Sequence, residues 1–189
     1  MSEQELDQLG RTLAGVLRHF PERFGLDMDE QGFVSIRGFI NSLRDSNRRY
    51  HWIRPHHIVA IIETDPKGRY QISNDLMRAT YGHSLELDLK LPTENIPDHL
   101  YYPATPEEAD IILETGLRPS DRKMVHLSKT YQDAMNAGKV RVEEPVILEI
   151  DAAAAIASGN VISQAGKTVF LAQEIPPEFL SRKEEEEVL

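Results

Sequence analysis

A proline-bounded segment near the middle of this 189-residue chain separates two halves with different patterns. The segment begins at Leu91-Pro92 and ends at Ile96-Pro97, and proline disfavours both helix interiors and central strands. The half before it shows mainly helical periodicity, whereas the half after it consists of short β-like runs and few long helices. We therefore expect an α+β chain with two domains, residues 1–92 and residues 93–189.

The N-terminal half has the element order of a winged-helix module. Apolar residues at helical spacing predict a first helix over residues 4–18, and Phe33-Val34 predicts a short strand. Ser35 is a candidate N-cap for a second helix, and Pro55 begins a third. A basic turn at residues 64–68 then leads into a strand. This order predicts a winged helix whose wing is the basic turn.

The C-terminal half is predicted to be richer in strands. Its β-branched and apolar runs predict four strands and two helices. The predicted strands are His99–Tyr102, Val125–Ser128, Pro145–Ile150 and Thr168–Ala172, and the predicted helices are Glu107–Thr115 and Tyr131–Ala137. Each helix is followed by a glycine, a residue that commonly ends helices.

The composition excludes several classes of protein. Hydrophobic residues make up 40% of the chain, yet no apolar run approaches the roughly 20 residues of a membrane span. The acidic N-terminus lacks the apolar core of a signal peptide. The chain has no cysteine, which excludes disulfides, thiolate nucleophiles and cysteine-ligated zinc. We expect a cytoplasmic protein that does not contact a membrane and acts as a monomer.

The charge is distributed unevenly along the chain. A net charge of −10 argues against indiscriminate binding to nucleic acid. Residues 1–92 carry 12 Lys and Arg against 13 Asp and Glu, whereas residues 93–189 carry 9 against 18. The nearly neutral N-terminal half contains clustered arginines, namely Arg44, Arg48, Arg49, Arg69 and Arg78. A phosphate partner would therefore meet a local arginine pocket rather than a broad basic field.

The main candidate functional motif is Arg18-His19, at the end of the first predicted helix. A guanidinium beside an imidazole can bind a phosphate with one group and move a proton or bind an oxygen with the other. Three later stretches, residues 67–70, 78–84 and 125–128, contain groups suited to the same anion. Each motif alone has a simpler reading, because Arg18-His19 could merely complement a helix dipole and His126 could be a core histidine.

Together these stretches resemble the NAD-dependent RNA 2′-phosphotransferases, which act on 2′-phosphates left in RNA, notably at tRNA splice junctions. The resemblance extends from Leu13 to about Leu180 and rests on motifs that occur in the family's order. These motifs are Leu17-Arg18-His19, Gly32-Phe33-Val34, Lys67-Gly68-Arg69-Tyr70, Arg78-Ala79, Gly82-His83-Ser84, Val125-His126-Leu127-Ser128, Thr168-Val169-Phe170-Leu171 and Pro176-Pro177.

The resemblance implies a winged-helix N-terminal lobe and a C-terminal lobe with an ADP-ribosyltransferase-like fold that binds NAD+. In the implied reaction, the RNA 2′-phosphate attacks the ribose carbon that carries nicotinamide, and the neighbouring ribose hydroxyl then attacks that phosphate. The products are 2′-OH RNA, ADP-ribose 1″,2″-cyclic phosphate and nicotinamide. NAD+ is a co-substrate, and no metal is expected, because positioning and electrostatic stabilisation carry most of such chemistry.

The family's catalytic residues are three arginines and one histidine, and Arg18, His19 and Arg69 match directly. The fourth position falls in Gly138-Lys139-Val140-Arg141, where this chain has one extra residue, so Arg141 is expected and Lys139 is the alternative. The resemblance also implies NAD contacts and RNA or phosphate contacts. The former are expected at Tyr102, Thr105, His126, Leu127 and Ser128, and the latter at Arg78 and His83.

The chain departs from the family in the first strand of the C-terminal lobe. The family commonly has leucine-tyrosine-histidine-glycine-threonine, whereas this chain reads Leu100-Tyr101-Tyr102-Pro103-Ala104. Tyr102 thus stands where the family has a histidine that helps hold the NAD ribose. Tyrosine can still donate a hydrogen bond, so we expect this departure to alter NAD affinity rather than the phosphate site.

Two other functions are compatible with the same residues. One keeps the fold and transfers ADP-ribose onto a terminal phosphate of RNA or DNA, stopping after the first step. The other is a non-catalytic winged-helix protein that binds nucleic acid and senses a ligand through its C-terminal lobe.

Overall fold

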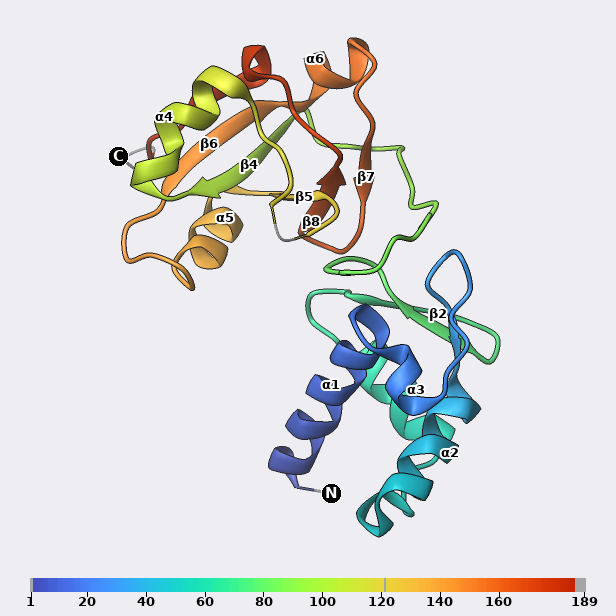
Figure 1. The fold of residues 1–189 in the computed structure, drawn as a ribbon. Helices are drawn as coiled ribbons and strands as arrows, with labels where there is room; N and C mark the ends of the chain where they lie inside the picture. The colour runs from blue at the N-terminus through green and yellow to red at the C-terminus, as the bar shows by residue number, and fades with distance from the viewer. Residues whose placement is uncertain (1, 121, 186–189) are drawn as a thin grey trace. The chain divides into compact units, whose positions relative to one another are not determined.

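The computed structural model describes residues 2–120 and 122–185, in which the chain forms two units with separate hydrophobic cores (Figure 1). The N-terminal unit ends at Lys90 and the C-terminal unit begins at Leu91, whereas the sequence placed the boundary after Pro92. Both units contain helices and strands, so the chain is of mixed α+β class. Within the described residues, no helix is both long enough and apolar enough to cross a membrane.

The N-terminal unit contains a small antiparallel sheet and three α-helices in the order that the sequence predicts. Its elements are α1 (Glu3–Arg18), η1 (Pro21–Phe24), β1 (Val34–Ser35), α2 (Ile36–Ser46), η2 (Arg48–Tyr50), α3 (Pro55–Glu63), β2 (Tyr70–Ser73) and β3 (Leu76–Ala79). The strand order is β1-β3-β2, with Val34 opposite Met77 and Gln71 opposite Arg78.

The expectation that the basic turn forms the wing is wrong. Residues 64–68 connect α3 to β2, and the hairpin between β2 and β3 turns instead at Asn74-Asp75, where Asn74 has φ 55°. Asparagine tolerates this left-handed conformation and is common in such tight turns. The Asn74-Asp75 pair is the local signal in the sequence that identifies the hairpin turn.

Local capping and apolar faces explain the helices of this unit. Ser2 and Glu5 form a capping box at the start of α1, whose buried face includes Leu9 and Leu13. Ser35 Oγ accepts the Gly38 N–H at 3.0 Å, which confirms Ser35 as the N-cap of α2. The inner faces of α1, α2 and α3 pack into one core, and each fully buried Leu, Ile or Phe stabilises it by about 1.5–3 kcal/mol.

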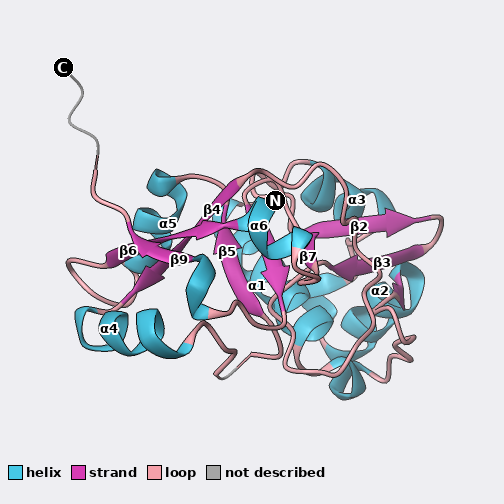
Figure 2. Cartoon of the chain, turned by 90° about the horizontal axis from the view of Figure 1, so that it is seen from above, coloured by secondary structure: helices cyan, strands magenta, loops and turns pink. Residues whose placement is uncertain are grey.

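The C-terminal unit is a six-stranded antiparallel sheet with the order β7-β8-β5-β4-β6-β9 (Figure 2). Its elements are β4 (His99–Ala104), α4 (Pro106–Thr115), β5 (Val125–Ser128), α5 (Tyr131–Gly138), β6 (Val146–Asp151), α6 (Ala152–Ala157), β7 (Ile162–Gln164), β8 (Val169–Ala172), η3 (Pro177–Phe179) and β9 (Leu180–Arg182). The two short outer strands β7 and β9 were not predicted from the sequence.

Helices α4 and α5 lie on opposite faces of the central strands (Figures 1 and 2). Ala104 and Tyr102 of β4 pack with residues of α4. On the other face, Pro103 meets α5 so closely that a Cβ on Gly138 would lie 2.7 Å from its Cβ. Only glycine fits this crossing, which fixes the position of the loop that follows α5.

Candidate functional site

Arg18 and His19 end α1 and are tied to the segment that follows β3. The Ser84 N–H donates to the Arg18 carbonyl at 3.1 Å, and His19 Nδ1 lies 2.9 Å from Ser84 Oγ. Gly82 has φ 85°, and a Cβ there would lie 3.0 Å from Arg18 Nε. A glycine is therefore needed both for the turn and for the close approach of the Arg18 side chain.

Arg69 is held by Asp65, four residues earlier in the turn after α3. Asp65 Oδ2 accepts the Arg69 backbone N–H at 2.7 Å, and Asp65 Oδ1 accepts from Arg69 Nη2 at 2.7 Å. Asp65 is buried, whereas 34% of the Arg69 side chain is exposed. Burial raises the pKa of Asp65, but the hydrogen bonds and charge of Arg69 outweigh it, so the net shift is downward. Asp65 is thus ionised and orients a guanidinium that reaches solvent.

The segment from Thr80 to Ser84 brings these two parts together. At its first residue, the Thr80 N–H and Oγ1 both donate to the Arg69 carbonyl, at 2.9 and 3.1 Å. At its last residue it contacts Arg18 and His19, as described above. Between them lies the buried Tyr81, whose ring centroid is 5.0 Å from Arg18 Cζ.

Arg18 and Arg69 both affect the pKa of the Tyr81 phenol. Burial raises the pKa of Tyr81, and the positive charges of Arg18 and Arg69 both oppose that rise. Both guanidinium groups therefore lie within electrostatic reach of one phenol. The N-terminal unit thus groups Arg18, His19 and Arg69, an arrangement suited to binding a dianionic phosphate.

Arg78 and His83 occupy buried positions in the same unit. Only 4% of Arg78 is exposed, and its guanidinium donates to Gln71 Oε1 and to the carbonyls of Gln31 and Leu89. Burial lowers the pKa of Arg78, with partial compensation from Asp29. His83 is 7% exposed. The geometry gives Arg78 a structural role in joining β3 to two loops, and contact with RNA by either residue stays a prediction.

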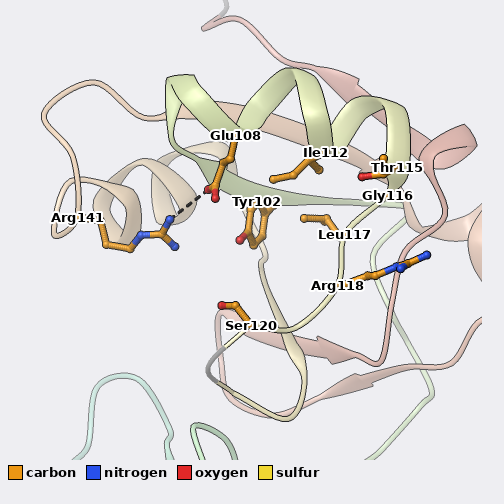
Figure 3. A pocket seen from close by; sticks show the side chains of 9 residues that line it. All are labelled: Tyr102, Glu108, Ile112, Thr115, Gly116, Leu117, Arg118, Ser120 and Arg141. Carbon is orange, nitrogen blue, oxygen red and sulfur yellow. Dashed lines mark hydrogen bonds and ion pairs between the residues drawn. The ribbon is translucent and has the colours of Figure 1, made fainter.

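The C-terminal unit has a pocket of about 430 Å³ beneath α4 (Figure 3). Ile112 and Leu117 form its apolar walls, and its polar lining comes from Tyr102, Glu108, Thr115, Arg118, Ser120 and Arg141. Figure 3 shows Arg141 reaching from the loop after α5 toward Glu108. Their Nη2 and Oε1 atoms are 3.1 Å apart. Lys139, the alternative to Arg141, is the exposed C-cap of α5.

Arg141 is stabilised in its charged form by its neighbours in this pocket. Burial lowers the pKa of Arg141, but a hydrogen bond with the Tyr102 side chain and the charge of Glu108 outweigh it, so the net shift is upward. The arrangement places a guanidinium, a phenol and a carboxylate together beside the apolar wall. A second hollow of about 440 Å³, lined by residues of the first turns of α1, contains none of the predicted site residues.

The five predicted NAD contacts do not share one surface. Side chains alternate along a strand and directly paired residues share a face, so Ser128, opposite Tyr101, lies on the α5 face with His126. Tyr102 lies on the α4 face, at the pocket. Leu127 is 1% exposed and belongs to the core. Thr105 is the N-cap of α4 and accepts the Glu108 N–H at 3.3 Å.

The strand register places Ser128 beside Tyr101 and on the face opposite to the Tyr102 side chain, and NAD contact by any of the five residues stays a prediction. His126 Nδ1 lies 3.0 Å from the Met124 carbonyl, a contact made within its own strand and the preceding loop. The position of a residue along β4 or β5 follows from the sequence, but the face on which its side chain lies depends on how these strands pair.

Asp65 and Glu108 were missed as parts of the site. Both have a local signal in the sequence. Asp65 precedes Pro66 in a turn, and Glu108 is the third residue after Thr105, the spacing of a capping box. Neither local signal shows that Asp65 also binds the Arg69 guanidinium or that Glu108 also binds the Arg141 guanidinium.

Comparison with known proteins finds one family over most of the chain. Residues 4–174 match the family described as RNA 2′-phosphotransferase, Tpt1 / KptA family. A probable RNA 2′-phosphotransferase of Thermoplasma acidophilum is 45% identical over 189 residues, which cover 100% of this chain and 80% of that protein. Similar proteins of Methanosarcina barkeri and Pyrococcus horikoshii are 42% and 37% identical, over 98% and 92% of this chain and 87% and 97% of their own lengths. The chain therefore belongs to the RNA 2′-phosphotransferase family.

Proposed function

We propose that this protein is an NAD+-dependent RNA 2′-phosphotransferase. It transfers an internal 2′-phosphate of RNA, such as one left at a tRNA splice junction, to NAD+. The products are 2′-OH RNA, ADP-ribose 1″,2″-cyclic phosphate and nicotinamide. The observation that carries this proposal is the grouping of Arg18, His19 and Arg69 by the segment 80–84, in a chain that belongs to this family.

The proposal includes a fold for each unit. The order of α1, β1, α2, α3, β2 and β3, with a three-stranded sheet, supports a winged-helix N-terminal lobe. The antiparallel sheet of the C-terminal unit, with helices on both faces, is compatible with an ADP-ribosyltransferase-like lobe.

In the proposed mechanism, the N-terminal unit binds the 2′-phosphate. Arg18 and Arg69 supply two guanidinium groups that remain charged at any physiological pH, and each can bind two phosphate oxygens. His19 is exposed, and its Nδ1 is engaged with Ser84 Oγ, so Nε2 is the ring nitrogen that faces a ribose hydroxyl or a phosphate oxygen. These groups stabilise the charge that develops during phosphoryl transfer without a metal ion.

The pocket of the C-terminal unit fits part of a dinucleotide. Arg118 and Arg141 suit phosphate groups, and the hydroxyls of Tyr102 and Ser120 suit a ribose. NAD+ would supply the acceptor ribose and the leaving nicotinamide. Tyr102, which stands in the place of the family's histidine, would orient a ribose through its phenol.

The proposal is tested with an RNA that carries one internal 2′-phosphate, incubated with and without NAD+. We expect the phosphate to be lost only with NAD+, together with release of nicotinamide and the cyclic ADP-ribose product. Release of inorganic phosphate without NAD+ would overturn the proposal. Accumulation of a stable ADP-ribosylated nucleic acid would instead identify the alternative reaction that stops after one step.

Variants of α1 test the phosphate site directly. Arg18→Ala should lower kcat/KM on the order of 10²–10³-fold, because it removes a preorganised charge from the transition state. Arg11→Ala is the matched control, since Arg11 lies on the same helix and 84% of its side chain is exposed. Equal activities of the two variants would remove Arg18 from the site. RNA binding that persists without any turnover in the wild-type protein would favour a non-catalytic binder.

A further inference from the structure

Glu108 is fixed by the start of α4. Its Oε1 accepts the Thr105 backbone N–H at 2.9 Å, and its own N–H donates to Thr105 Oγ1 at 3.3 Å. This reciprocal capping box holds the carboxylate against the first turn of the helix. The same Oε1 atom accepts a hydrogen bond from Arg141 Nη2 at 3.1 Å. One oxygen thus connects the cap of α4 with the loop that follows α5.

Tyr102 approaches Arg141 from a second rigid element. It lies in β4, opposite Leu148 of β6, and packs against the apolar cluster formed with α4. Its side chain lines the same pocket as Arg141, and its presence there contributes to raising the pKa of the guanidinium. Arg141 itself lies in a loop next to Val140, which is 87% exposed, so its own neighbours along the chain do little to orient it. The orientation of its guanidinium comes from a helix cap and a central strand.

The ion pair is too exposed to stabilise the fold appreciably. About half of the Arg141 side chain and a third of the Glu108 side chain are exposed (53% and 36%). Ion pairs in such positions are screened by water and contribute little to the free energy of unfolding. A guanidinium has five N–H donors, so contacts on one side still leave donors for an anion. The arrangement is therefore better suited to orienting Arg141 than to stabilising the unit.

We propose that Glu108 and Tyr102 are positioning residues that orient the Arg141 guanidinium for phosphate binding in the reaction. The inference rests on the proposed function, because it assigns supporting residues to Arg141 in the C-terminal pocket proposed to hold part of NAD+. Neither residue needs to touch the transferred phosphate. The effect of Glu108 on turnover should pass entirely through Arg141, and the effect of Tyr102 should pass through it in part, because the phenol is also proposed to orient a ribose.

A double-mutant cycle with 2′-phosphorylated RNA and NAD+ measures this dependence. Glu108→Gln keeps an oxygen for the Thr105 cap and removes the charge, and Tyr102→Phe removes only the hydroxyl. Each should lower kcat/KM on the order of 10-fold in the wild-type background, with an unchanged unfolding midpoint. In the Arg141→Ala background Glu108→Gln should have no further effect, and Tyr102→Phe should have a smaller effect than in the wild-type background. Glu107→Gln, an exposed neighbour on α4, is the control that should leave activity unchanged.

The inference is overturned if Glu108→Gln and Tyr102→Phe lower kcat/KM equally in both backgrounds, or have no effect in the wild-type background. Wild-type protein without NAD+-dependent turnover would instead contradict the proposed function. A second measurement does not depend on turnover. The Nε–Hε NMR signal of Arg141, assigned with Arg141→Lys, should report a restricted side chain in the wild-type protein and a mobile one in Glu108→Gln/Tyr102→Phe. Equal mobility in both proteins would refute the positioning role by itself.

Discussion

Replacing Asp65 with asparagine removes the carboxylate that orients Arg69 while nearly preserving side-chain volume. In the wild-type protein, Asp65 accepts three N–H groups of Arg69, namely the backbone N–H at 2.7 Å, Nη2 at 2.7 Å and Nε at 3.1 Å. Asparagine has one carbonyl oxygen and one amide group. Any rotamer therefore directs an N–H donor at a guanidinium or backbone donor, and the ionic attraction is lost.

The expected loss of stability follows from these contacts and from their exposure. A hydrogen bond to a charged group contributes about 1.5–3 kcal/mol, and breaking a buried ion pair removes about 3–5 kcal/mol. Asp65 is almost fully buried, but a third of the Arg69 side chain (34%) is exposed, so water can replace part of what the arginine loses. We expect Asp65→Asn to lower the free energy of unfolding by about 2 kcal/mol.

Urea denaturation followed by tryptophan fluorescence measures this change in the correct unit. Trp52 is the only tryptophan of the chain and packs against the core of the N-terminal unit. Asp7→Asn is the matched control, because Asp7 and Arg11 form an ion pair with the same i,i+4 spacing but with 76% and 84% of their side chains exposed. The control should change the free energy of unfolding by less than about 0.5 kcal/mol.

The effect of Asp65→Asn should also depend on pH in one direction. The pKa of Asp65 is lowered in the folded protein, so its stabilisation is fully present above the unfolded-state pKa of about 3.9. It is lost as the pH falls through the lower, folded-state pKa. The difference between wild type and Asp65→Asn should therefore be constant near neutral pH and shrink below about pH 4. Equal stability at pH 7, or a difference that persists in acid, would refute the reasoning.

Two glycines give further predictions. Gly82→Ala should lower kcat/KM on the order of 10-fold or more, because its Cβ would displace the Arg18 side chain and its φ of 85° is strained for alanine. Gly10→Ala, where a Cβ meets nothing within 4 Å, is the comparison in a steady-state assay and should retain full activity. Gly138→Ala should destabilise the C-terminal unit by about 2–4 kcal/mol through overlap with Pro103, measured by calorimetry, and a wild-type melting curve would contradict that packing.

The parts of the fold that depend on local pattern could be read from the sequence. Ser35 is recognisable as an N-cap because a polar residue precedes an apolar helical face, and Arg18-His19 is recognisable as a helix end because Pro21 follows it closely. Such signals act within a few residues. They located α1, α2 and α3 and the loops that carry Arg18 and Arg69, but not the contacts between them.

The parts that depend on pairing between distant residues could not be read in this way. Whether His126 and Tyr102 share a face is decided by the pairing of Tyr101 with Ser128, and a shift of one residue would reverse the answer. Arg78 has the same kind of ambiguity. An arginine in a strand looks like a surface charge until the Leu89 carbonyl, eleven residues later, is seen to accept its hydrogen bond.

Asp65 and Glu108 show how a local signal and a distant contact can coincide in one side chain. Each carboxylate has a conventional backbone role, Asp65 as acceptor for the N–H of Arg69 after a turn and Glu108 as acceptor for the Thr105 N–H in a capping box. A carboxylate fixed by backbone hydrogen bonds loses little further conformational freedom when it also binds a guanidinium. Such a carboxylate can therefore hold an arginine in one orientation, ready to bind a phosphate, with little further loss of conformational entropy. In a chain whose proposed chemistry depends on arginines, capping and turn carboxylates are the first residues to examine as their supports.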